Sequence, residues 1–160
     1  MWESFKPFFE WNEKIWIGQA ISGTIWAFPV IETIHILALT VMFGAVVIID
    51  LRMLGLGMRK QSVALLAKNL EPYMTWGLVT MLATGYLLFT SEAMKCFIND
   101  GFKFKMAFLF PAIVFQYTLF RWVTHKDEDK RPMLLGWAVA LLSLTLWFGV
   151  GVGGRAIGFV

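Results

Sequence analysis

The residues best suited to chemistry are Glu32 and His35, which lie in an otherwise apolar stretch in the pattern Glu-x-x-His. That stretch, residues 28–52, has the length and composition of a membrane-spanning helix. An ionisable side chain inside such a helix is costly, so it indicates a functional site. The only other histidine, His125, lies in a charged loop. His35 is therefore the main candidate for imidazole chemistry within a bilayer.

Several kinds of chemistry fit His35. A neutral imidazole can ligate haem b, with a methionine (Met42, Met81 or Met106), His35 of a second copy, or nothing on the other face. The Glu-x-x-His pair can bind copper or iron, although a di-iron bundle needs two such pairs. The pair can also form a proton relay or line a polar path. The structural alternative is a cofactor-free histidine that hydrogen-bonds Glu32 or a threonine hydroxyl.

The composition defines the elements that would position these residues. The chain is 58% hydrophobic and 16% charged, and its mean hydropathy is +0.66. Its apolar residues fall in blocks of roughly 18–25, the length that crosses a bilayer. We therefore predict an all-α integral membrane protein, a four-helix antiparallel bundle in a single domain, 1–160. The expected spans are about 26–49, 72–90, 104–122 and 133–152.

The segments outside the spans are more polar. Residues 2–21 carry charges on one helical face, which predicts an amphipathic helix lying in the headgroup region. The alternative is a helix packed across the end of the bundle. A short amphipathic helix is expected over 62–70, and Pro72 is suited to opening the second span.

Other polar residues in or near the spans have structural explanations. Asp50 and Arg52 are expected to form an ion pair at the end of the first span. Pro111 is expected to kink the third span, and Gln116 and Tyr117 to satisfy the freed backbone.

Cysteine content and charge exclude several classes of protein. The single Cys96 excludes an internal disulfide or a thiolate cluster within one chain. The net charge of +3 comes from basic residues between apolar blocks, which favours lipid contact and not nucleic acid. Phosphate-binding loops and hydrolase motifs are absent.

Four spans place both chain ends on one side. The loops 52–68 and 121–131, on the other side, carry eight Lys or Arg against six elsewhere, which predicts periplasmic termini. The same topology brings one set of charged residues to the terminal half, where the cations could neutralise carboxylates such as haem propionates. The set is Glu32, His35, Glu92, Lys103, Lys105 and Arg155.

Several motifs carry a family resemblance: W-A-F-P-V-I-E-x-x-H (26–35), D-L-R-M-L-G-L (50–56), L-E-P (70–72), G-Y-L-L-F (85–89) and F-K-x-K-M (102–106). They resemble an uncharacterised family of small four-span bacterial inner-membrane proteins, remotely similar to the membrane domain of copper-resistance protein D. The resemblance implies a bacterial inner-membrane location and no assigned activity. Four-span haem proteins such as the membrane protoporphyrinogen oxidases pair an intramembrane histidine with a nearby lysine. Here His35 would pair with Lys103 or Lys105.

Together these observations favour a bacterial inner-membrane protein in a redox-associated role, binding haem b or a transition metal through His35. One alternative is a transporter or channel-like oligomer with Glu32 and His35 in a polar path. Another is a small accessory subunit of a larger membrane complex. The expected partners are the lipid bilayer, further copies of the chain or a membrane complex. The sequence does not decide whether the protein is an enzyme.

Overall fold

The computed structural model describes residues 2–126 and 132–159, and this part of the chain is helical with no strand. The all-α prediction is thereby confirmed for the described residues. Most of the charged turn expected over 125–132 lies outside them. The elements in chain order are η1 (Trp2–Phe5), α1 (Lys6–Glu13), α2 (Trp16–Ser22), α3 (Ala27–Met53), α4 (Val63–Ser91), α5 (Ala93–Ile98), α6 (Asp100–Phe115), the π-helical η2 (Gln116–Phe120), α7 (Arg121–Thr124) and α8 (Met133–Ala156).

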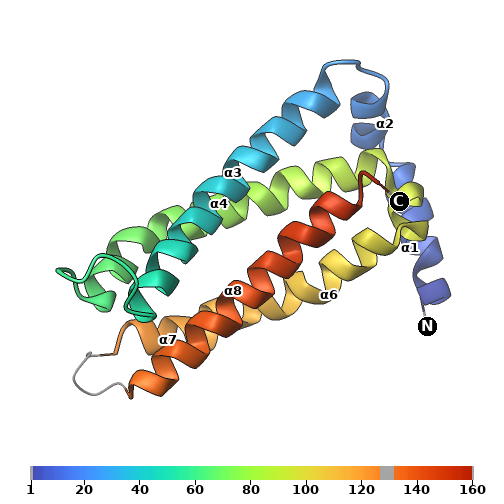
Figure 1. Cartoon of the computed structure of the whole chain (residues 1–160). Coiled ribbons are helices and arrows are strands. Elements are labelled where there is room, and N and C mark those ends of the chain that lie inside the picture. Colours follow the sequence, from blue (N-terminus) through green and yellow to red (C-terminus); the bar gives the residue numbers. More distant parts are fainter. Residues whose placement is uncertain (1, 127–131, 160) are drawn as a thin grey trace.

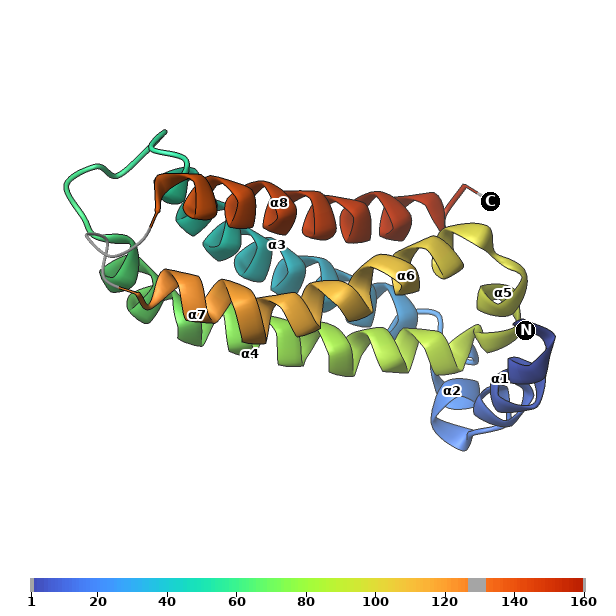
Figure 2. The ribbon, with the colours of Figure 1, turned by 90° about the horizontal axis from the view of Figure 1, so that it is seen from below.

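Helices α3 and α4, the run from α6 to α7, and helix α8 lie side by side, and each runs opposite to the one before it in the chain (Figures 1 and 2). Helix α3 packs mainly on α4, and α6 mainly on α8, while α3 also contacts α8. Within the described residues, three segments are long and apolar enough to cross a membrane: α3, the run Asp100–Thr124 and α8. These three helices suggest a membrane protein.

Helix α4 differs from the expected break before Pro72. It begins at Val63, where the hydroxyl of the N-cap Ser62 accepts a hydrogen bond of 3.2 Å from the Leu65 N–H. Pro72 lies inside this helix, so the separate short helix expected over 62–70 is wrong. A proline removes one backbone donor, here the partner of the Lys68 carbonyl. Both Lys68 and Pro72 are exposed, so the helix continues past them.

The N-terminal segment packs across one end of the long helices (Figure 2). It is divided into η1, α1 and α2. Phe9 of α1 is buried against Phe97 and Phe102, and Trp2 donates a 2.8 Å hydrogen bond to the Phe97 carbonyl. The Tyr86 hydroxyl donates to Asn12 Oδ1 at 3.0 Å. Of the two expectations for this segment, these contacts match the second, a segment packed across the end of the bundle.

The main core lies away from this end. Every buried residue of α3 falls between Met42 and Met53, and residues 27–41 include none. The first half of α3 thus packs on α4 but leaves its remaining surface uncovered by the described residues. His35 lies in this uncovered half.

A buried amide links three helices in the main core. Gln116, in η2, donates to Met74 Sδ at 3.4 Å and accepts from Trp147 Nε1 at 3.3 Å. The expectation that Gln116 satisfies backbone groups freed by Pro111 is therefore wrong. Its amide joins α4 to α8 through the π-helical turn.

Candidate functional site

His35 is half-buried where α3 meets α4. Its Nδ1 lies 3.0 Å from Thr84 Oγ1. The Thr84 hydroxyl in turn donates to the Thr80 carbonyl at 2.7 Å, so its single hydrogen is already used. We therefore assign the imidazole proton to Nδ1, which donates it to Thr84 Oγ1. This tautomer leaves a lone pair on Nε2, the state that ligates a metal or accepts a proton.

Gly85 makes room for the imidazole. A Cβ at this position would lie 3.0 Å from His35 Cε1 and 3.5 Å from Nδ1. About two helical turns earlier in α4, a Cβ on Gly77 would lie 2.7 Å from Met42 Cβ. The two glycines let α3 and α4 approach closely, which holds His35 against Thr84.

Lys105 of α6 reaches the same end of the molecule. Its backbone packs on α8 so closely that a Cβ on Gly153 would lie 2.8 Å from Lys105 N and Cα. Its ammonium lies beside Gly154, the residue after Gly153 in α8, and is within electrostatic range of His35. It also acts on Cys96 of α5. The structure thus places one imidazole and one ammonium group, from separate helices, within electrostatic range of each other.

The other expected site residues lie apart from this pair. The Lys103 ammonium is 2.7 Å from Asp100 Oδ1 and 5.8 Å from the Trp2 ring centroid. Arg155 is exposed, with its guanidinium 4.5 Å from the Phe159 ring. Neither residue is joined to His35 by a described contact.

Glu32 does not provide the partner of His35. It is exposed one turn toward the start of α3, and the described contacts include none to the imidazole. The imidazole instead hydrogen-bonds the hydroxyl of Thr84, which is the threonine partner expected as the structural alternative. No pattern in the sequence points to Thr84 in particular, because interhelical register is not encoded in the pattern of one helix.

A metal ion bound by His35 would have few further ligands from the described side chains. Within residues 2–126 and 132–159, no group of three or more His, Cys, Asp or Glu side chains could hold an ion. The described residues therefore hold no closed site built from three or more such side chains. A haem needs fewer protein ligands, because the macrocycle supplies four nitrogens.

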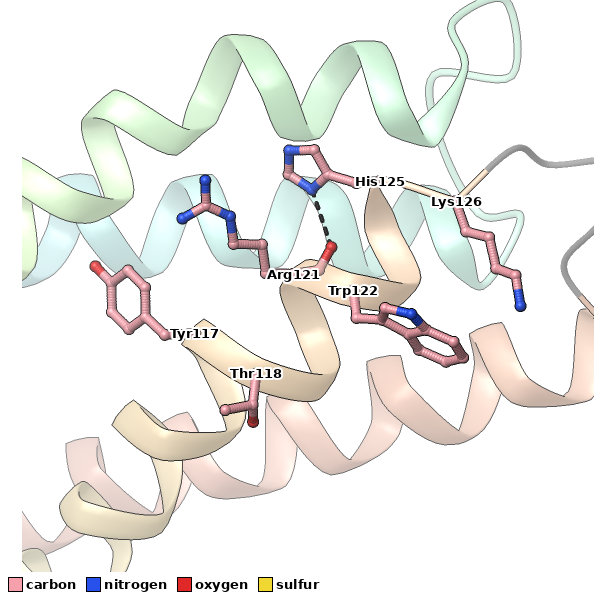
Figure 3. A pocket seen from close by; sticks show the side chains of 6 residues that line it. All are labelled: Tyr117, Thr118, Arg121, Trp122, His125 and Lys126. Atoms are coloured by element: carbon pink, nitrogen blue, oxygen red, sulfur yellow. Dashed lines mark hydrogen bonds between the residues drawn. The ribbon is translucent and has the colours of Figure 1, made fainter.

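The second histidine directly follows α7, which lies at the end of the bundle away from the labelled chain termini (Figure 1). Figure 3 shows its side chain beside Arg121. His125 Nδ1 donates to the Arg121 carbonyl at 2.9 Å, and its Nε2 is 3.4 Å from Glu71 Oε2. Glu71 also pairs with the Arg121 guanidinium at 2.9 Å. These groups tie α7 to α4 beside an open pocket of about 570 Å³. The pocket is lined by Tyr117, Thr118, Arg121, Trp122, His125 and Lys126.

The described residues define an all-helical protein with three potential membrane helices and one oriented histidine. Residues 8–160 match the family described as "Family of unknown function (DUF6644)", and the chain belongs to that family. The predicted resemblance to an uncharacterised family is confirmed. No curated protein and no solved structure matches the chain.

Proposed function

We propose that the protein spans the bacterial inner membrane four times and binds haem b through His35, in a redox-associated role. The observation that supports this most directly is the hydrogen bond from His35 Nδ1 to Thr84, which leaves Nε2 available. Histidine ligands commonly have their second nitrogen fixed in this way.

The surroundings of His35 suit a flat, partly anionic ligand. The uncovered surface of residues 27–41 offers lateral access, and Lys105 supplies a cation for a propionate. Arg155, in the last turn of α8, lies at the same end of the bundle as Lys105. After a side-chain rotation its guanidinium would pair with a second propionate. The remaining axial position would be open, or filled by a methionine or by His35 of a second copy.

The four-span topology uses α4 as the additional span. At 29 residues, α4 is long enough to cross, although its polar side chains make it less apolar than the other three. The charge bias of the loops then places both termini in the periplasm. Reporter fusions at the two termini and in the loop 54–62 would test this orientation.

The test for haem is an absorption spectrum of protein purified in mild detergent from cells supplied with haem and metals. We expect a Soret band that His35→Ala abolishes and His125→Ala retains. The second variant is a matched control, because it removes the other imidazole. A colourless, metal-free, well-folded protein would refute the proposal for haem and for metals alike.

The polar-path function is a second candidate, favoured by the exposed position of Glu32 on α3. Beyond His35, the inward face of α3 continues with Met42 and Val46, which are 1% and 0% exposed. A polar path would therefore run between copies of the chain and not through one. Ion flux in liposomes that Glu32→Gln abolishes would support this function over haem binding.

A further inference from the structure

Asp50 is a carboxyl group enclosed by the main core. It lies near the end of α3 and is 0% exposed, as are its neighbours Val46 and Ile49. Its position, 15 residues beyond His35, is about 22 Å further along the helix axis at 1.5 Å per residue. Asp50 therefore belongs to a different part of the molecule from the proposed haem site.

Neither carboxyl oxygen of Asp50 has a hydrogen-bond partner among the described residues. Among the described residues, the side chain that acts on it is Ser143 of the facing helix α8. Ser143 is also 0% exposed, and its hydroxyl likewise lacks a partner. The two orphaned groups therefore face each other across the contact between α3 and α8.

Two charged residues described at this end of the bundle, Arg52 and Glu71, are engaged elsewhere. Arg52 donates from Nε to the Gln61 carbonyl at 2.6 Å. Glu71 of α4 binds Arg121 and His125. The expected ion pair between Asp50 and Arg52 is therefore not formed, because side chains two residues apart on a helix point to nearly opposite sides.

An ionised Asp50 would be a charge without compensation in a medium of low dielectric constant. A metal cation could compensate it, but sites for Ca²⁺ or Mg²⁺ need about six or more oxygen ligands. Two carboxyl oxygens and one hydroxyl are too few, and the helical carbonyls nearby are used in the helices. A proton needs neither a cavity nor further ligands.

We propose that Asp50 is a proton-binding site, in which the carboxylic acid donates its O–H to Ser143 Oγ and thereby joins α3 to α8. Only the protonated acid can donate this bond, so the bound proton is part of the packing. Removal of the proton would place a bare charge between the two helices and weaken their contact. The site is independent of haem binding at His35.

Infrared spectroscopy of the purified protein at neutral pH tests the protonation directly. We expect a carboxylic acid carbonyl band that Asp50→Asn removes, since exposed carboxylates are ionised there. Ser143→Ala should keep the band and move it to higher frequency, because the hydrogen bond is lost. If the wild-type band is absent, or if Asp50→Asn leaves it unchanged, the proposal is wrong.

Stability gives a second measurement. The folded state holds the proton, whereas the unfolded chain releases it at neutral pH, so stability should fall as pH rises. Asp50→Asn, which mimics the neutral acid, should flatten this dependence. Stabilisation of the wild type by NaCl and not by choline chloride, lost in Asp50→Asn, would instead identify a cation site and overturn the proposal. If Asp50→Asn does not fold, the Ser143→Ala band shift remains decisive.

Discussion

His35 Nδ1 lies 3.0 Å from Thr84 Oγ1, and the Thr84 hydrogen is directed to the Thr80 carbonyl. A single hydroxyl thus fixes both the tautomer and the orientation of the imidazole. A group that hydrogen-bonds the second nitrogen of a histidine ligand typically raises the affinity of the bound metal or cofactor by about tenfold to hundredfold.

Thr84→Val should therefore weaken haem binding by about tenfold to hundredfold, because it removes the acceptor for the Nδ1 proton. Thr84→Ser keeps the hydroxyl and should bind nearly as the wild type does. Titration of apo-protein with haem, followed by the Soret band, measures both. Nitrogen NMR of His35 should show the proton on Nδ1 in the wild type; a proton on Nε2 would contradict the assigned tautomer.

Gly85→Ala should displace the imidazole without unfolding the protein. The new Cβ would lie 3.0 Å from His35 Cε1, so the ring must move by a few tenths of an ångström. Haem affinity should fall while the thermal midpoint changes little. Gly44→Ala is the matched control on α3, where a Cβ meets nothing within 4 Å. Equal haem affinity in the two variants would show that the ring position does not matter.

The contact between α6 and α8 should be sensitive to one methyl group. Gly153→Ala would place a Cβ 2.8 Å from the Lys105 backbone, which cannot move aside as a flexible side chain could. We expect a loss of about 1–3 kcal/mol of stability, typical of overpacking. Gly151→Ala, on the same helix with nothing within 4 Å, should be neutral or mildly stabilising. Thermal unfolding in detergent distinguishes them, and equal midpoints would argue against this close packing.

Cys96 should be an unreactive thiol at neutral pH. Burial, reinforced by the charge of Glu92, raises its pKa from 9.0 to about 11, despite nearby Lys105 and Lys95. The reactive thiolate is therefore scarce below pH 11 and increases as pH rises toward that value. The rate of maleimide labelling against pH measures this directly, with the denatured protein as control. A labelling rate that levels off near pH 9 would show an ordinary, accessible cysteine.

The apolar helices were the part of the fold most readily predicted. The runs around Val46, Val114 and Val139 are long and lack charges, so hydropathy locates α3, α6–α7 and α8. The sequence does not predict the start of α4, because Pro72 is typical of a first helical turn and here lies inside the helix. On an exposed surface, the loss of one backbone hydrogen bond did not outweigh the continuity of the helix.

The candidate site was predicted only in part. The cost of an imidazole in an apolar helix pointed to His35, and topology placed Lys105 at the same end. Thr84 and Ser143 could not be found, because they depend on how far one helix is shifted along its neighbour. Small differences in that register change every interhelical partner, and no feature of a single sequence measures them.

The uneven burial of α3 also has a consequence for hydrogen exchange. Residues 27–41 include no buried side chain, whereas the following half of the helix is enclosed by α4 and α8. Segments with few buried contacts open at a lower free energy than the core. Local fluctuations should therefore open the helix more often around His35 than around Ile49. The backbone amide hydrogens around His35 should exchange faster. The bundle would be loosest where a ligand must enter and most rigid where Asp50 is enclosed.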